Sequence, residues 1–510
     1  MQNNNNKVLL KITNLRQYFP VGKKGLYVKA NDGITLNIYE GETLGLVGES
    51  GCGKSTFGRT LLQLYRQTDG RTMYYGASRD ELAPAYVRNT VSRLDKLREN
   101  MHKLEDKYKE VKAQYDAADE KQQLVMHSNL TAAKKLADDA YHNIVSLIGG
   151  FIVAEDLEPV SRIYQERYAA CLKLKKLIEA KKPVELDYGE VVYSNEKRRE
   201  EGKEVSSGKA ERLKAKVADF DARIADARKA IAEIDARIAS MRQQYASHPE
   251  FAQHEQMRDD GIDLARLTYN EVRLIRNQMQ YIFQDPYSSL NPRMTVSEII
   301  GEGMLAHKYF KKNNDRMQDE VLKVMDQCGL APYFIHRYPH QFSGGQRQRI
   351  GIARSLAVRP RFVVCDEAVS ALDVSIQSQI LNLLQDLKEQ ANLTYLFITH
   401  DLSVVKYISD RIGVMYLGTM VELAASDEMF KHPLHPYTEA LLESIPTTEE
   451  KKDLVVLEGD IPSPVNPPKG CKFHTRCKYC TEVCTHVVPE LKEVRPNHFV
   501  ACHHILEGNL

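Results

Sequence analysis

The sequence predicts an α/β fold that is built around a phosphate-binding loop and interrupted by a long helical segment. Apolar, strand-like runs lead into a glycine-rich loop within 42–56 and into an acidic pair within 361–373. Between them, residues 77–260 carry apolar side chains at alternating steps of three and four, the spacing of a coiled coil. Five of the nine cysteines lie between Cys471 and Cys502, which predicts a small cysteine-rich extension after the α/β fold.

The totals constrain the class of protein. At 510 residues the chain is too long for one ordinary core, so two or three compact units are expected. A formal net charge of +1 gives no overall attraction to nucleic acid. The opening MQNNNNKVLLKI lacks the pattern of a signal peptide, and no stretch reaches the roughly 18 apolar residues of a membrane span. We therefore expect a reducing cytoplasm, with any membrane part supplied by partner proteins.

The stretch ETLGLVGESGCGKST has the pattern of a P-loop. An apolar run at 44–47 leads into Gly48, and Gly53, Lys54 and Ser55 complete the spacing. Glycines let backbone N–H groups turn toward phosphate oxygens, and the following helix adds the positive end of its dipole. We expect Lys54 to bind the β- and γ-phosphates and Ser55 to bind Mg²⁺. The residues expected around the phosphates are Gly48, Glu49, Ser50, Gly51, Cys52, Gly53, Lys54, Ser55 and Thr56.

A second apolar run, within RFVVCDEAVSALD, ends in two acids. It places Asp366 and Glu367 at the carboxyl end of a predicted strand, where open α/β sheets bind ligands. Asp366 fits the role of a Mg²⁺ ligand, and Glu367 is placed to polarise the water that attacks the γ-phosphate. An isolated Asp-Glu pair is typical of a solvated turn, but the P-loop upstream favours the catalytic interpretation.

Three further stretches complete a set of motifs: YIFQDPYSSLNPRMTV at 281–296, QFSGGQRQRIGIARSL at 341–356 and LFITHD at 396–401. Together with the two sites above, this set resembles the ATPase domain of ABC transporters. The resemblance implies that Gln284 links Mg²⁺ and the attacking water to a transmembrane partner. It also implies that His400 is the switch histidine that contacts the γ-phosphate.

The resemblance assigns further contacts with ATP. Phe19 lies where an aromatic ring stacks on adenine, with Tyr18 as a neighbouring competitor. The signature and D-loop positions match Ser343, Gly344, Gly345, Gln346 and Asp373. In the resembled family, one subunit's signature binds the γ-phosphate of ATP held by the opposite subunit. Because this chain has one P-loop and one signature, we expect a dimer.

The C-terminal part of the sequence resembles one particular group within this family. The stretches HPLHPYTEALLESIP at 432–446 and GDIPSPVNPPKGCKFHTRCKYCTEVC at 459–484 are similar to the C-terminal extension of oligopeptide and dipeptide importer ATPases. Their prolines and glycines predict an irregular segment that packs on the ATPase body.

The cysteines of the extension leave three interpretations open. In some members of that family four cysteines hold an iron–sulfur cluster, and the matching positions are Cys471, Cys477, Cys484 and Cys502. Cys480 departs from the pattern and forms a Cys-x-x-Cys pair that suggests zinc, completed by residues such as His474. Reduced cysteines without a metal are the third interpretation. Any metal is expected to stabilise the structure of the extension rather than to undergo redox turnover.

The insertion carries two apolar seams. The first contains Leu94, Leu97, Met101, Leu104, Tyr108, Val111 and Tyr115, and the second runs from Leu213 to Tyr245. Charged residues flank both seams, which predicts a coiled coil. We expect the two runs to pair antiparallel as one hairpin, with 116–212 supplying a continuation, a polar loop at 194–211 and a tip. A long amphipathic helix lying on the ATPase body is the alternative.

The expected organisation is an α/β, ABC-type P-loop ATPase domain interrupted by an antiparallel α-helical coiled coil. The segments are 1–76 and 261–430 for the ATPase domain, 77–260 for the insertion and 431–510 for the extension. The resemblance implies ATP hydrolysis that powers peptide import from the cytoplasmic face of the membrane, with ATP binding closing a dimer and hydrolysis assisted by Glu367 reopening it. The implied partners are a second, non-identical ATPase subunit, two permease subunits and, indirectly, an external solute-binding protein.

Two other classes of ATPase share features with this sequence. Coiled-coil ATPases of DNA repair or chromosome maintenance also split an ABC fold, but their arms are usually longer and they lack this extension. Ribosome-associated ABC factors carry two cassettes in one chain, whereas this chain has one. No nucleic-acid partner is therefore expected.

Overall fold

The computed structural model describes residues 7–22, 26–205, 207–444 and 459–506. The first six residues and parts of the predicted extension, 445–458 and 507–510, lie outside this range. The chain forms two compact units. The first comprises Met1–Gly76, Asp263–Ala265 and Val272–Leu510, and the second comprises Ala77–Ile262 and Arg266–Glu271.

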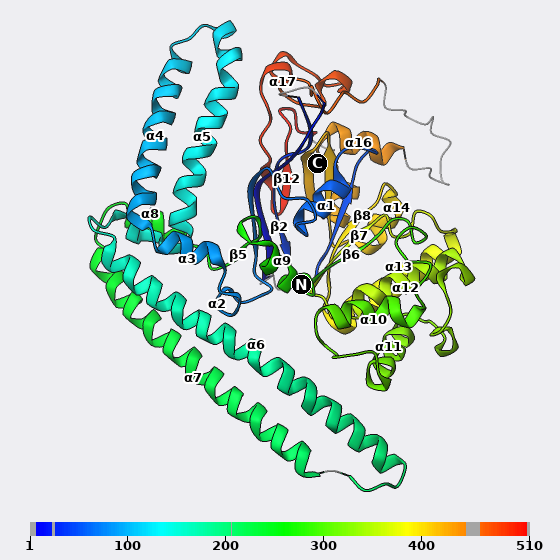
Figure 1. The fold of residues 1–510 in the computed structure, drawn as a ribbon. Helices are drawn as coiled ribbons and strands as arrows, with labels where there is room; N and C mark the ends of the chain where they lie inside the picture. Colours follow the sequence, from blue (N-terminus) through cyan, green and yellow to red (C-terminus); the bar gives the residue numbers. More distant parts are fainter. Residues whose placement is uncertain (1–6, 23–25, 206, 445–458, 507–510) are drawn as a thin grey trace. The chain divides into compact units, whose positions relative to one another are not determined.

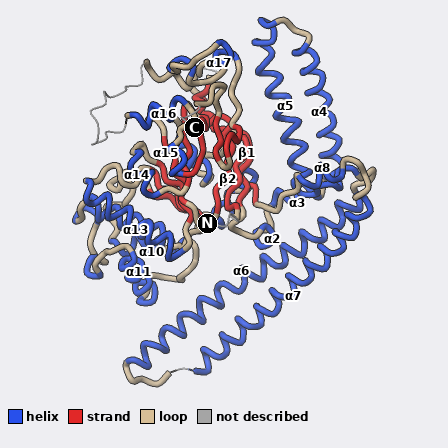
Figure 2. The backbone as a smooth tube through the Cα atoms, turned by 180° about the vertical axis from the view of Figure 1, so that it is seen from behind, coloured by secondary structure: helices blue, strands red, loops and turns tan. Residues whose placement is uncertain are grey.

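An eight-stranded sheet forms the centre of the first unit (Figures 1 and 2). Its order is β11-β12-β10-β9-β3-β8-β7-β6, in which β3 pairs in parallel with β8 and β9, and β7 pairs in parallel with β6 and β8. The strands are β3 (Thr43–Val47), β6 (Met279–Ile282), β7 (Phe362–Asp366), β8 (Thr394–Ile398), β9 (Arg411–Tyr416), β10 (Thr419–Ala425), β11 (Lys492–Arg495) and β12 (His498–Val500). Every residue of β3, β7 and β8 is buried, as expected for parallel strands covered on both faces.

The C-terminal extension contributes to this central sheet. β12 pairs antiparallel with β10 and β11 with β12, so the sheet continues from the ATPase strands into the tail. The prediction of an irregular segment is therefore incomplete. The strands are only four and three residues long, which is too short for their alternation to be recognised from sequence.

A second, four-stranded sheet has the order β2-β1-β4-β5. Its strands are β1 (Val8–Pro20), β2 (Tyr27–Tyr39), β4 (Asp69–Tyr74) and β5 (Ile262–Asp263). β1 pairs antiparallel with both β2 and β4. Thus β4 and β5, which flank the insertion in sequence, lie in the same sheet.

Several helices of the first unit begin at side chains that cap them. Thr295 with Glu298, and Ser343 with Gln346, form capping boxes, and Asp373 caps the next helix. The helices are α1 (Lys54–Leu61), α10 (Val296–Ala306), α11 (Asp315–Gln327), α12 (Gly344–Leu356), α13 (Val374–Ala391), α14 (Leu402–Ile408), α15 (Ser426–Lys431), α16 (Pro436–Glu443) and α17 (Glu482–His486). The helix α9 (Tyr269–Ile275) spans the sequence boundary between the units. Apolar side chains of α10 to α13 pack against β7 and β8 in one buried cluster.

The second unit consists of helices. They are α2 (Arg79–Leu82), α3 (Ala85–Val91), α4 (Leu94–Asp116), α5 (Glu120–Ile148), the 3₁₀ helix η1 (Gly149–Val153), α6 (Glu158–Glu200), α7 (Ser207–Tyr245) and α8 (Phe251–Gln256). The long helices pair as α4 with α5 and as α6 with α7, and both views show these two hairpins. Of the second seam, Ile224, Ala227 and Ile231 share a buried cluster with Leu174 and Leu177 of α6.

The predicted pairing of the two seams with each other is therefore wrong. The connection from α4 to α5 spans only Ala117 to Asp119, and so short a link makes consecutive helices antiparallel neighbours. The predicted loop at 194–211 is also too long, because α6 continues to Glu200 and α7 begins at Ser207. With 43 residues, α6 extends about 65 Å at 1.5 Å per residue.

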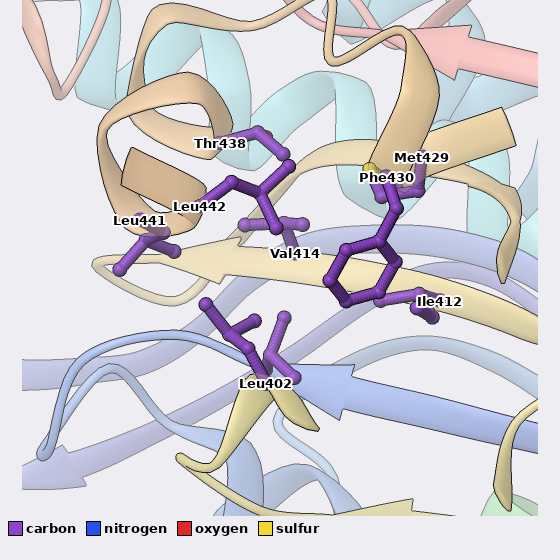
Figure 3. Close-up of a pocket in the computed structure, with 9 residues that line it drawn as sticks. Leu402, Ile412, Val414, Met429, Phe430, Thr438, Leu441 and Leu442 are labelled. Carbon is purple, nitrogen blue, oxygen red and sulfur yellow. The ribbon is translucent and has the colours of Figure 1, made fainter. Parts of the chain in front are cut away.

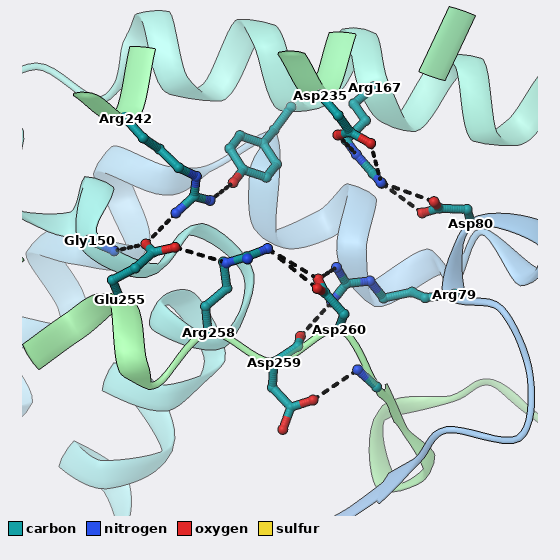
Figure 4. Close-up of polar contacts among 12 residues, drawn as sticks. Arg79, Asp80, Gly150, Arg167, Asp235, Arg242, Glu255, Arg258, Asp259 and Asp260 are labelled. Atoms are coloured by element: carbon teal, nitrogen blue, oxygen red, sulfur yellow. Dashed lines mark hydrogen bonds and ion pairs between the residues drawn. The ribbon is translucent and has the colours of Figure 1, made fainter. Parts of the chain in front are cut away.

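Arginine–carboxylate contacts join several helices of this unit to one another (Figure 4). Arg167 of α6 forms two hydrogen bonds with Asp80, of 2.7 and 3.0 Å, and two with Asp235 of α7, of 2.6 and 3.1 Å. Glu255 accepts hydrogen bonds from Arg242 and from the backbone N–H of Gly150. Burial alone would raise the pKa of Asp80, but the adjacent guanidinium of Arg167 lowers this pKa below its usual value. Paired, partly buried charges thus join α6 to α2 and α7, and α7 to α8.

Candidate functional site

The predicted phosphate loop connects β3 to α1. Gly48 and Gly53 have φ angles of 145° and 101°, which L-residues with a side chain rarely adopt. A Cβ at Gly48 would lie 2.2 Å from the carbonyl oxygen of Met415, and one at Gly53 would lie 2.0 Å from that of Ala30. Both glycines are therefore required by backbone conformation and by close packing, and Gly53 immediately precedes the first turn of α1.

Lys54 and Ser55 lie at the start of α1. Lys54 is 6% exposed, and its ammonium donates hydrogen bonds to the carbonyl oxygens of Gly48, at 2.7 Å, and Glu49, at 3.0 Å. Ser55 Oγ donates a 2.7 Å hydrogen bond to Asp366 Oδ1. The two predicted Mg²⁺ ligands of β7 and α1 are thus in direct contact.

Asp366 has contacts that the sequence did not indicate. The hydroxyl of Tyr281 donates to its second oxygen, and Arg59 lies 3.6 Å from the same oxygen. The Tyr281 hydroxyl also accepts a 3.2 Å hydrogen bond from Arg59 Nε. These groups come from β6 and α1 and fix the carboxylate at the end of β7.

The three predicted catalytic residues converge. Gln284 Nε2 donates a 2.5 Å hydrogen bond to Glu367 Oε2, and His400 Nδ1 lies 3.1 Å from Glu367 Oε1. Glu367 has a φ of 46°, an uncommon backbone conformation for a residue with a side chain. Just after the carboxyl end of β7, Glu367 is thus a strained acidic residue held between an amide and an imidazole.

The signature residues form a helix start. Ser343 Oγ accepts a 3.3 Å hydrogen bond from the backbone N–H of Gln346, whose side chain in turn accepts from the backbone N–H of Ser343 at 3.1 Å. Gly344 is the first residue of α12, and a Cβ at Gly345 would lie 2.5 Å from Ile376 Cγ2. Asp373 Oδ1 caps α13 by accepting a 3.0 Å hydrogen bond from the backbone N–H of Ile376. This geometry presents the N-terminus of α12, which suits an anion.

The adenine-stacking candidates differ in their surroundings. Phe19 contacts Tyr65 edge to face, with ring centroids 5.2 Å apart. Tyr18 donates a 2.5 Å hydrogen bond to Asp32, which also pairs with Lys472 at 3.0 Å. The hydroxyl of Tyr18 is therefore engaged in this network, whereas Phe19 has no such polar contact.

Side chains of the extension contact the phosphate loop. Arg476 donates to both carboxylate oxygens of Glu49, at 2.8 and 3.1 Å. The backbone N–H of Glu49 donates to the hydroxyl of Tyr437 at 2.9 Å. The sequence predictions missed both residues, and no local pattern marks them, because they lie some 390 to 430 positions from the loop.

The four predicted cluster cysteines line one pocket, together with His435, Pro436, Phe473, His474, Tyr479, His503 and His504. Within the described residues, however, no group of three or more cysteine, histidine or acidic side chains is arranged to hold a metal ion. Burial raises the pKa of Cys471 to about 11 and that of Cys502 to about 12. The donor types suit iron or zinc, but the geometry does not support either metal.

A second pocket lies beside α15 and α16 (Figure 3). Its lining is apolar apart from Thr438, and includes Ile412, Val414, Phe430 and Leu441. It offers no charged group for a phosphate, so it is not a nucleotide site.

Among the helices that the structure describes, none is long and apolar enough to cross a membrane.

A buried lysine in a glycine-rich loop, a serine–aspartate pair and an adjacent glutamate together define a P-loop ATPase. Comparison with known families agrees. The family described as ABC transporter matches residues 31–218 and 237–370, more than half of the chain, and the description Oligopeptide/dipeptide transporter, C-terminal region, matches residues 421–484. The chain belongs to the ABC transporter family of ATP-binding proteins, and it is an ATPase.

Curated relatives are similar over about half of this chain. The oligopeptide transport ATP-binding protein AppF of Bacillus subtilis (strain 168) is 52% identical over 250 residues, which cover 48% of this chain and 75% of AppF. The oligopeptide transport ATP-binding protein OppF of Salmonella typhimurium is 50% identical over 246 residues, or 48% of this chain and 73% of OppF. Among solved structures, the dimeric ATP-binding cassette MJ0796 aligns with 82% of this chain and 99% of that chain, at 16% identity and a TM-score of 0.43, too low to add to the assignment.

Proposed function

We propose that this chain is the ATP-hydrolysing subunit of an ABC importer of peptides, working at the cytoplasmic face of the membrane. The observation that carries the proposal is the double match: an ABC ATPase together with the C-terminal region of oligopeptide and dipeptide transporters. Relatives about half identical to the aligned part of the chain are named as oligopeptide transport ATP-binding proteins. Nothing in these similarities favours the DNA-repair or chromosome-maintenance alternative.

The site geometry supports a division of roles in hydrolysis. Lys54 supplies positive charge inside the loop, and Ser55 and Asp366 are placed to hold Mg²⁺. Mg²⁺, when bound, would offset the charge of the β- and γ-phosphates. The Glu367 carboxylate would accept a proton from the attacking water, while Gln284 and His400 orient that carboxylate. Phe19 would stack on adenine.

We also propose that the active form is a dimer with a second, non-identical ATPase subunit. The signature group, Ser343, Gly344, Gly345 and Gln346, would bind the γ-phosphate of ATP held by that subunit, with Asp373 beside it. These residues form the N-terminus of α12, and the positive end of a helix dipole suits a phosphate, which supports the proposal. ATP binding would close the dimer, and hydrolysis would reopen it. Two permease subunits and an external solute-binding protein would complete the importer.

Recovery of partners tests the importer proposal. Affinity purification of the tagged full-length chain from detergent-extracted native membranes should recover two hydrophobic permease subunits and a second ATPase. The Glu367→Gln variant with ATP should increase the yield of the second ATPase, since closed dimers accumulate when turnover stops. Recovery of DNA-repair proteins with DNA-stimulated ATPase activity, and of no permease, would contradict the proposal.

The coiled-coil prediction is retained for the second seam, with α6 as its partner. Ile224, Ile231 and Leu174 in one buried cluster support it, and charged residues of α6 and α7 form ion pairs across the helices, such as Lys181 with Asp221 at 2.6 Å. The variant Ile231→Asp of the full chain should lose helicity at a lower temperature by circular dichroism, whereas Lys229→Asp, on the exposed side of α7, should not. Equal melting of both variants would contradict the pairing.

The iron–sulfur prediction for Cys471, Cys477, Cys484 and Cys502 rests on their shared pocket and on the donor type alone. Zinc, with Cys480 or His474 as a further ligand, is the competing prediction. Iron, sulfide and zinc analysis of anaerobically purified protein separates the two. Protein free of both metals would rule out a resident metal and leave reduced cysteines.

A further inference from the structure

The P-loop of this protein contains an acidic side chain at its second position. Within GESGCGKST, residues 48–56, the charged side chains are Glu49 and Lys54, so the loop alone has no net charge. A carboxylate in a phosphate-binding loop would repel the phosphates of a bound ATP. A positive group paired with Glu49 would remove this repulsion.

Arg476 of the extension supplies that group. Its guanidinium forms a two-pronged pair with the Glu49 carboxylate, with N–O distances of 2.8 and 3.1 Å. The Arg476 side chain is only 4% exposed and that of Glu49 is 22% exposed, so water screens the pair weakly. Arg476 is also 3.5 Å from the hydroxyl of Tyr416.

A second contact fixes the backbone at the same residue. The N–H of Glu49 donates to the hydroxyl of Tyr437 at 2.9 Å, and Tyr437 is fully buried. The Tyr437 ring packs against Tyr416, with centroids 4.8 Å apart, and against Phe473, at 5.3 Å. The extension thus holds both the side chain and the backbone of the loop's acidic residue.

We propose that Arg476 is a positioning residue that neutralises Glu49 and so keeps the P-loop attractive to ATP. The extension is thereby part of the nucleotide site, in addition to any role it has elsewhere. Arg476 acts through Glu49 and need not touch ATP. The inference depends on ATP binding by this chain and not on peptide being the cargo, so a failure of the importer proposal leaves it standing.

The test compares single and double variants of the full-length chain by ATP titration with Mg²⁺ in a calorimeter. Arg476→Ala leaves the Glu49 charge uncompensated and should raise the Kd for ATP at least tenfold. Adding Glu49→Gln to Arg476→Ala removes that charge and should restore the Kd to within about threefold of the wild type. Arg476→Lys keeps the charge but loses the two-pronged geometry and should fall between.

A matched control comes from the same extension. Arg495 of β11 pairs with Glu428 at 3.2 Å, away from the loop, so Arg495→Ala removes an arginine pair of the extension without altering Glu49. This variant should bind ATP as the wild type does. The melting temperature of each variant is recorded, and ATP affinity is measured well below it.

Two results would overturn the inference. The first is an unchanged Kd in folded Arg476→Ala protein. The second is a raised Kd that Glu49→Gln does not lower, because a purely structural role for Arg476 would make the double variant at least as defective as the single one. Only a role in neutralising the Glu49 charge predicts that Glu49→Gln restores ATP affinity to the Arg476→Ala variant.

Discussion

Ser55 Oγ donates a 2.7 Å hydrogen bond to Asp366 Oδ1, although the two residues are 311 positions apart in the sequence. The contact joins the first turn of α1 to the end of β7 and brings together two of the three side chains predicted to bind Mg²⁺, the third being Gln284. We expect Asp366→Asn to raise the Mg²⁺ concentration for half-maximal ATPase activity at least tenfold, because an amide is a poorer ligand for a hard cation. Mg²⁺ titration of steady-state turnover checks this. An unchanged half-maximal concentration would remove Asp366 from that role.

Lys54 should be necessary for nucleotide affinity. Its side chain is buried, its ammonium donates hydrogen bonds to the carbonyl oxygens of Gly48 and Glu49, and it is the one basic residue of the loop at 48–56. Lys54→Ala should weaken ATP binding by two orders of magnitude or more, as measured by equilibrium titration. Lys388→Ala is the control, since Lys388 pairs with Asp410 outside the phosphate loop. Near-normal ATP affinity in Lys54→Ala would contradict the account.

The stability of the first unit should fall in mild acid through His435. Burial lowers the pKa of His435 to about 4, with Glu422 opposing the shift, and its ring nitrogen accepts the backbone N–H of Tyr437 at 3.0 Å. The unfolded chain binds this proton near pH 6.5, so the contribution to stability is present above that pH and is lost progressively toward pH 4. The loss is roughly 3 kcal/mol at most.

His435→Asn provides the matching test, because asparagine also accepts a hydrogen bond at a helix start but does not titrate. Between pH 7 and pH 4.5, the melting temperature of the wild type should fall further than that of this variant. Equal losses in the two proteins would show that another group controls the acid transition.

Removal of residues 77–260 should leave ATP binding intact. The strands that flank this segment, β4 and β5, lie in one sheet, so a short glycine-serine linker can join their ends. The phosphate loop, β7 and the catalytic side chains all belong to the first unit. The shortened chain should bind ATP within a few-fold of the full chain and unfold cooperatively. Loss of all nucleotide binding in a folded shortened chain would contradict the separation of the units.

The parts of the site that could be predicted are those whose signal is local. The glycine spacing before Lys54 and the acids that follow an apolar strand need only a few neighbouring residues. The partner of a helix is not encoded in its own periodicity: the seam from Leu213 to Tyr245 predicts a packed face but does not say that α6 covers it. The pairing of Arg476 with Glu49 has no local signal, because the fold brings together groups 427 positions apart.

Turnover by the Glu367→Gln variant tests the central claim most directly. Glu367 lies between Gln284 and His400, and the account makes its carboxylate the base for the attacking water. The purified variant should bind ATP at least as well as the wild type and hydrolyse it at least a hundredfold more slowly in single-turnover experiments. Hydrolysis at the wild-type rate would contradict the account.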